Sequence, residues 1–139
     1  MMKYVVAYLG AAGTFLIVDL VWLGLVAKTF YRDRIGSLML DEINLPPAIL
    51  FYGLYVAGIV IFAVTPALHT GSWRTALLFG ATFGLIAYAT YDLTNLATLR
   101  NWSVAMTVVD IAWGSFLTGV SATAGFMITR YVFPASSGS

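Results

Sequence analysis

The stretch TALLFGATFGLIAYATYDLTNLATL, residues 75–99, decides the fold class of this chain. It is apolar and long enough to cross a bilayer as a helix, because about 20 residues span roughly 30 Å of hydrocarbon. Its most polar residues stand three or four positions apart and therefore share one helix face: Tyr88, Tyr91, Asp92 and Asn95. An ionisable group at membrane depth is costly, so this face is a candidate functional site.

The composition of the whole chain agrees with a membrane protein. Of 139 residues, 60% are hydrophobic and 9% are charged, whereas soluble domains average about 25% charged residues. The absence of cysteine excludes disulfides and thiol chemistry, and the single histidine, His69, is too few for a haem or copper site. A net charge of +1 gives no basic field for nucleic acid. We therefore expect no cofactor and no nucleic-acid partner.

The apolar segments predict an all-α integral membrane protein, a four-transmembrane-helix bundle that occupies residues 1–134 as a single domain. The first segment is too long for a signal peptide and carries an aspartate. The expected spans are approximately 4–27, 48–68, 75–99 and 103–128.

The connecting segments predict where the spans end. Residues 28–47 are polar and of mixed charge, and we expect a long loop with a short interfacial helix. Pro46 and Pro47 can open the second span, and Pro66 is expected to mark its far end. Residues 135–139 are expected to be a flexible tail or an expression-vector remnant.

Four spans place both termini on one side of the membrane and residues 28–47 with Arg100 on the other, which we call the loop side. At 1.5 Å per helical residue, Asp19, Asp92 and Asp110 each lie roughly 12–14 Å from a loop-side boundary. Small and polar stripes on the first and fourth helices suggest that these carboxyls face one another. Tyr52 and Tyr55 of the second span reach the same layer.

These positions define the predicted site, which would bind a proton or a cation. Desolvation and like-charge repulsion favour protonated acids, a shared proton, a bound cation, or an arginine, Arg32 or Arg34, that folds in from the loop. The alternative is that protonated acids only hold the helices together. The binding residues are Asp19, Asp92, Asp110, Asn95, Tyr88 and Tyr91, with Tyr52, Tyr55, Trp22 and Trp113 in support, and the sequence does not indicate whether a metal is bound.

Two of the carboxylates lie in matching pieces of sequence. Val18-Asp19-Leu20-Val21-Trp22 and Val109-Asp110-Ile111-Ala112-Trp113 each place an aspartate three residues before a tryptophan. The match has two explanations: an inverted internal repeat, since the first and fourth helices run in opposite directions, or chance in apolar sequence. No nucleotide-binding glycine loop, hydrolase elbow or zinc-protease motif is present.

Several motifs together resemble a family of small bacterial predicted membrane proteins of unknown function. The most specific is Ala87-Tyr-Ala-Thr-Tyr-Asp-Leu-Thr-Asn-Leu-Ala-Thr98, and the resemblance reaches to about Ile128. It implies a bacterial four-span inner-membrane protein and carries no established activity. Further motifs that carry it are Asp19-Leu-Val-Trp-Leu-Gly24, Phe30-Tyr31-Arg32, Leu54-Tyr-Val-Ala-Gly58, Gly71-Ser-Trp-Arg74 and Val109-Asp-Ile-Ala-Trp-Gly114.

Two main classes of function follow from the residues. The first is a small proton- or cation-linked transporter or channel, acting as a homo-oligomer because four helices enclose little room. The second is a lipid-binding or lipid-modifying membrane enzyme, which ranks lower because the carboxylates lie below the headgroups; a structural or accessory subunit is a third possibility. The positive-inside rule favours a cytoplasmic loop side and both termini outside, because the loop side carries four of the seven Lys and Arg residues: Lys28, Arg32, Arg34 and Arg100.

Overall fold

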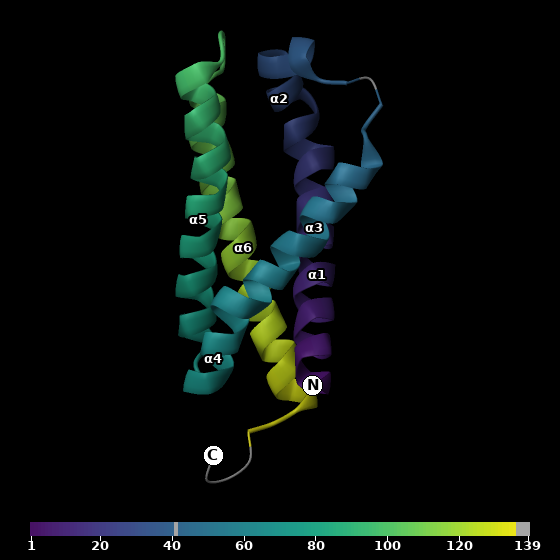
Figure 1. The fold of residues 1–139 in the computed structure, drawn as a ribbon, viewed down its shortest axis with the longest axis vertical. Coiled ribbons are helices and arrows are strands. Elements are labelled where there is room, and N and C mark those ends of the chain that lie inside the picture. Colours follow the sequence, from purple (N-terminus) through teal and green to yellow (C-terminus); the bar gives the residue numbers. More distant parts are fainter. Residues whose placement is uncertain (41, 136–139) are drawn as a thin grey trace.

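The computed structural model describes residues 1–40 and 42–135, and no strand occurs within them. Both termini lie at one end of the molecule, and the turn between the last two spans lies at the other (Figure 1). The prediction of an all-α four-helix membrane bundle is confirmed. The helical segments long and apolar enough to cross a membrane are Met2–Val26, Leu45–Thr70, Trp73–Thr98 and Val104–Val132.

The first span runs directly into the predicted interfacial helix. Helix α1 (Met2–Trp22) continues through a π-helical segment, η1 (Leu23–Ala27), into α2 (Lys28–Ile35), and a 3-10 turn, η2 (Gly36–Leu38), follows. In residues 28–47, where we expected a long loop with a short interfacial helix, the helix comes first and its backbone is continuous with α1. The polar α2 therefore lies at the loop side, at the end of the molecule opposite the termini (Figure 1).

The second span is longer than predicted at both ends and crosses the other helices obliquely (Figure 1). It consists of α3 (Leu45–Ile59), the π-helical η3 (Val60–Val64) and α4 (Thr65–Thr70). Pro66, which we expected to mark the far end of this span, lies four residues before its last residue, Thr70. Proline cannot donate a backbone hydrogen bond, and the wider π-helical turn before it accommodates the missing donor, so the helix continues to Thr70.

Helix α6 (Val104–Val132) lies at the centre of the bundle and packs against α1 and α5 (Trp73–Thr98). Small residues allow this close approach. A Cβ atom built on Gly80 would lie 2.9 Å from the carbonyl oxygen of Thr118, and one on Gly125 would lie 3.2 Å from that of Ala7. Helix α6 also extends past the predicted end at residue 128, so that Arg130 lies in its last turn.

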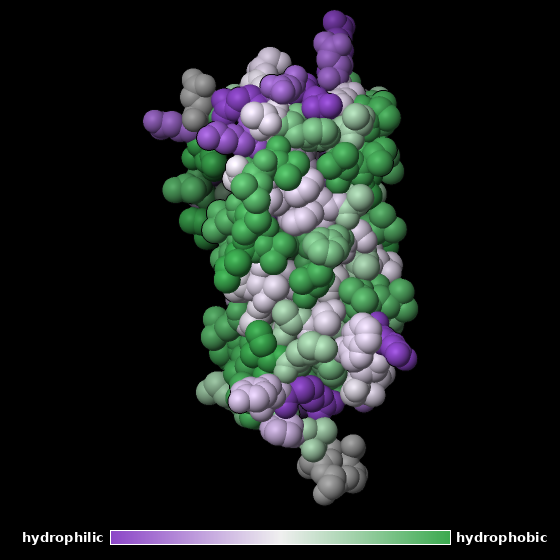
Figure 2. Space-filling model, turned by 180° about the vertical axis from the view of Figure 1, so that it is seen from behind, coloured by the Kyte–Doolittle hydropathy of each residue, from purple (hydrophilic) through white to green (hydrophobic). Residues whose placement is uncertain are grey.

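The core joins α1, the second span and α6 through fully buried side chains such as Phe15, Ile59 and Leu117. On the face shown in Figure 2, the middle of the molecule is mostly apolar, and the strongly hydrophilic residues lie towards its two ends. This is the surface expected of a protein surrounded by lipid. The predicted tail falls mainly on residues 136–139, which lie outside the described residues.

Candidate functional site

Asp19 of α1 joins three helices through its carboxylate. The hydroxyl of Tyr52 in α3 donates to its Oδ2 atom at 3.1 Å, and the indole Nε1–H of Trp113 in α6 donates to its Oδ1 atom at 3.3 Å. The Trp113 ring stacks on that of Trp22, with centroids 4.2 Å apart and planes 10° apart. The two Asp-x-x-Trp pieces found in the sequence therefore meet between α1 and α6.

Asp110 of α6 accepts a hydrogen bond from a residue at the loop side. The hydroxyl of Tyr31 in α2 donates to its Oδ1 atom at 2.6 Å. Burial raises the pKa of the Tyr31 phenol well above its usual range, and the hydrogen bond to Asp110 and the charge of that residue raise it further. Tyr31 therefore remains a protonated donor to Asp110.

Asp92 of α5 is the most unusual polar residue in the bundle. Its side chain is 0% exposed, and neither carboxyl oxygen has a hydrogen-bond partner within the described part of the chain. The carboxyl of Asp110 in α6 lies close to that of Asp92. Two adjacent carboxylates cannot both be ionised at low cost.

A cavity of about 460 Å³, which we call the loop-side cavity, separates part of α1 and α2 from α6. It has Asp19 and Asp110 in its wall, together with the cationic residues Lys28 and Arg32. Arg32 is one of the two arginines that the sequence suggested could approach the carboxylates. The remaining lining residues are Trp22, Leu23, Tyr31, Ile35, Met39, Ile43, Tyr88 and Trp113.

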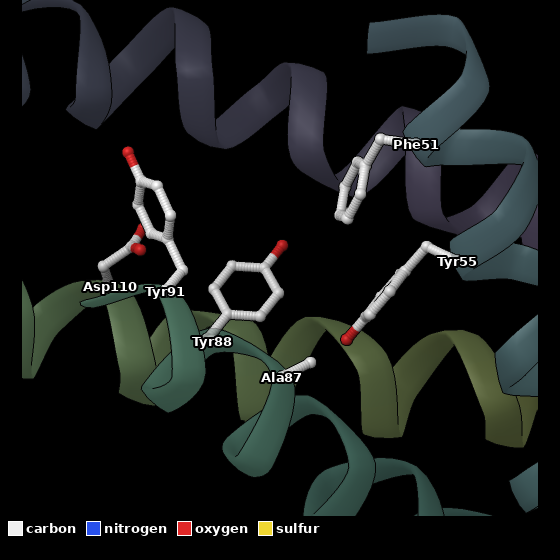
Figure 3. Close-up of a pocket in the computed structure, with 6 residues that line it drawn as sticks. All are labelled: Phe51, Tyr55, Ala87, Tyr88, Tyr91 and Asp110. Atoms are coloured by element: carbon white, nitrogen blue, oxygen red, sulfur yellow. The ribbon is translucent and has the colours of Figure 1, made fainter. Parts of the chain in front are cut away.

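A second cavity of about 350 Å³, which we call the aromatic cavity, lies beside the first. Figure 3 shows its lining side chains, which come from α3, α5 and α6. Tyr88 and Asp110 line both cavities, so the two cavities share these two residues. The lining residues are Phe51, Tyr55, Ala87, Tyr88, Tyr91 and Asp110.

The other predicted site residues fall in three different environments. Tyr55 is buried and its hydroxyl lies 2.8 Å from that of Thr118 in α6. Tyr91 is 55% exposed and packs edge-on against Trp102. Asn95 is half-buried, and its side chain makes no hydrogen bond to the described residues and lines neither cavity.

The three aspartates are distributed between two hydrogen-bonded groups. Asp19 pairs with Tyr52 and Trp113, whereas Asp110 lies with Tyr31 and Asp92. Within residues 1–40 and 42–135, no group of three or more Asp, Glu or His side chains could hold a metal ion.

Sequence reasoning did not assign Tyr31, Lys28 or Phe51 to the site. Tyr31 was noted only within the Phe30-Tyr31-Arg32 motif, because a residue beyond the first span cannot be placed against the fourth from spacing alone. Phe51 lies on a face of α3 that becomes part of a cavity only when α3 crosses the bundle obliquely.

The fold and the site define a multi-pass α-helical membrane protein with paired carboxyls inside its bundle. The chain belongs to the family described as predicted membrane protein DUF2177, whose sequence model matches residues 4–127. No curated protein and no solved structure gives a significant match. The family resemblance expected from the sequence is confirmed, and the family is one of unknown function.

Proposed function

We propose that this protein is a small membrane transport protein in which the Asp92–Asp110 pair binds and releases a proton. The observation that carries the proposal is the buried Asp92 carboxyl, which lies close to Asp110 and has no hydrogen-bond partner within the described residues. Asp110 in turn borders a cavity on either side. A proton shared by the pair can therefore pass to a group in either cavity.

The surroundings of the pair support exchange of its proton. Phenols approach it from α2 and α5, the Asp19 carboxylate lies across the loop-side cavity, and the cationic side chains of Lys28 and Arg32 line that cavity. The positive charges favour ionisation of the pair, and the burial of Asp92 opposes it. The phenols are those of Tyr31, Tyr88 and Tyr91.

Infrared difference spectroscopy over a pH series tests the proton site directly, through the carbonyl stretch of a protonated carboxyl. The wild type should show a titrating carboxyl band, and Asp92→Asn and Asp110→Asn should each remove it, because the two groups titrate as a pair. Asp33→Asn is the matched control, since Asp33 is exposed on α2. A wild-type protein without such a band would contradict the proposal.

Proteoliposomes containing a pH-sensitive dye test transport. Asp92→Asn should fold and be as thermally stable as wild type, because an amide keeps hydrogen-bonding capacity, and membrane hydrogen bonds are worth only about 0.6 kcal/mol. Proton movement should nevertheless fall to background in this variant. Asp92→Leu, which also removes the hydrogen bonds, should disturb packing. Wild-type vesicles that move no protons under a pH gradient, a membrane potential or an opposing gradient of an exchangeable cation would refute the transport function.

We also propose that the protein lies in the bacterial inner membrane with its loop side in the cytoplasm. Four of the seven Lys and Arg residues lie on that side, in agreement with the positive-inside rule. A Ser37→Cys variant should resist a membrane-impermeant thiol reagent in intact cells and react in inverted vesicles. Labelling in intact cells would show that the loop side faces outward and would contradict the proposed orientation.

A further inference from the structure

We propose that the aromatic cavity binds an organic ammonium ion with apolar substituents and exchanges it for the proton of the Asp92–Asp110 pair. This substrate class rests on the proposed function, since the exchanged proton is the one held by that pair. Aromatic rings from two helices and a single carboxylate line the cavity (Figure 3). That combination is the basis of the inference.

The rings form walls on different sides of the cavity. The Phe51 and Tyr55 rings on α3 are stacked, with centroids 5.3 Å apart and planes 24° apart. The Tyr88 ring on α5 stands edge-on to Tyr55, with centroids 6.2 Å apart. The faces of aromatic rings attract a cation that lies within about 6 Å of the ring centroid, and such cages recognise alkylated ammonium groups.

The single carboxylate restricts the kind of cation. A calcium ion takes about six to eight oxygen ligands, and magnesium requires an octahedral set, whereas this cavity offers one carboxylate and three phenols. A neutral apolar ligand would gain nothing from Asp110. An organic ammonium uses both features, because its charge pairs with the carboxylate and its alkyl groups contact the rings.

The cavity opens towards the surface that faces lipid. Phe51 is 49% exposed and Tyr91 is 55% exposed, and both lie on membrane-spanning helices. The volume of about 350 Å³ lies within the range of roughly 300–1,000 Å³ typical of small-molecule sites. A cation with apolar substituents therefore has a route into the cavity from the bilayer.

The exchange balances charge within the bundle. When one proton is shared by Asp92 and Asp110, the pair carries one negative charge, and removal of that proton adds a second. An incoming monovalent cation compensates this added charge. One organic cation therefore replaces one proton, and no covalent bond is made or broken. Within the described residues, the other titratable or charged groups that line the two cavities are Asp19, Lys28, Tyr31, Arg32, Tyr55, Tyr88 and Tyr91.

Calorimetric titration of the purified protein in detergent with benzyltrimethylammonium tests the site. Neopentylbenzene is the matched probe, because it has the same shape with carbon in place of the charged nitrogen. The wild type should bind the cation and not the neutral isostere. The dissociation constant should rise about tenfold for each unit by which the pH falls below the titration of the pair, because one proton competes with one cation.

Two leucine variants distinguish the contribution of the aromatic wall to cation binding from a general effect on packing. Phe51→Leu should weaken binding about fivefold, in keeping with the strength of a single cation–π contact. Phe62→Leu is the control and should bind as wild type, since Phe62 is also exposed on the second span but lies outside this cavity. Asp110→Asn should abolish the preference for the cation over its isostere.

Equal binding of both probes, binding independent of pH, or no binding of the cation would each overturn the inference. The infrared titration of the carboxyl pair uses no organic cation and therefore separates the two proposals. A titrating band without cation binding would support the proton site and contradict the proposed substrate class. Cation binding without a titrating band would contradict both the proton site and the exchange of a proton for the cation.

Discussion

The hydroxyl of Tyr31 donates a 2.6 Å hydrogen bond to Oδ1 of Asp110, across 79 positions of sequence. This bond connects α2, a polar helix at the loop side, with the carboxyl pair inside the bundle. The α2 helix is therefore attached to the candidate site through this bond.

Loss of the Tyr31 hydroxyl should loosen α2 while leaving the spans intact. In Tyr31→Phe we expect the free energy of unfolding to fall by about 1 kcal/mol, the usual worth of one hydrogen bond. Amide hydrogen exchange in residues 28–35 should become faster. Tyr131→Phe serves as the control, because Tyr131 is 88% exposed. Equal exchange in the two variants would show that the bond does not hold α2.

Alkaline pH should remove the contribution of Tyr31 to stability. Burial and Asp110 raise the pKa of Tyr31 in the folded state above its unfolded value of about 10. Unfolding therefore releases a proton at high pH, so the contribution is complete below about pH 10 and is lost as the pH rises further. The difference in unfolding free energy between wild type and Tyr31→Phe should shrink above that pH. A constant difference across the range would contradict this assignment.

Removal of the Asp19 carboxylate should destabilise the contact between α1 and α6. Asp19→Ala leaves the donors of Tyr52 and Trp113 without their acceptor, which costs about 1–3 kcal/mol each for a buried group. The near-UV circular dichroism of the stacked Trp22 and Trp113 rings should decrease. Asp19→Asn, which keeps an acceptor oxygen, should retain most of this signal. An unchanged signal in the alanine variant would mean that the stack forms without Asp19.

Two glycine substitutions should have opposite effects. A Cβ at Gly84 would collide with the backbone carbonyl of Gly114 and lie 2.7 Å from Oγ1 of Thr118, whereas one at Gly13 meets nothing within 4 Å. Gly84→Ala should therefore lower stability by about 1–3 kcal/mol. Gly13→Ala should raise it by about 0.5–1 kcal/mol, because alanine favours a helix. Thermal unfolding in detergent measures both, and equal shifts would contradict the close α5–α6 packing.

Hydropathy and charge alone were sufficient to predict the four spans. Lipid cannot hydrogen-bond a backbone, so an apolar segment of sufficient length must form a helix whatever its neighbours are. Pro66 was a less reliable guide to the end of the second span. Proline disfavours a continuous helix, but a π-helical turn precedes Pro66 and the helix continues to Thr70. The sequence also identified the carboxylates, because ionisable residues are rare at that depth.

The partners of those carboxylates were decided by the tertiary structure. The periodicity of a helix assigns a residue to a face, but the rotation and crossing of the helices determine which faces meet. Asp92 consequently lies beside Asp110, while Asp19 pairs with Tyr52 and Trp113. Tyr31 reaches Asp110 only because α2 continues from α1 as a helix, and Phe51 joins a cavity only because α3 is oblique. Local sequence determined each helix and its polar groups, and long-range packing between helices determined the site.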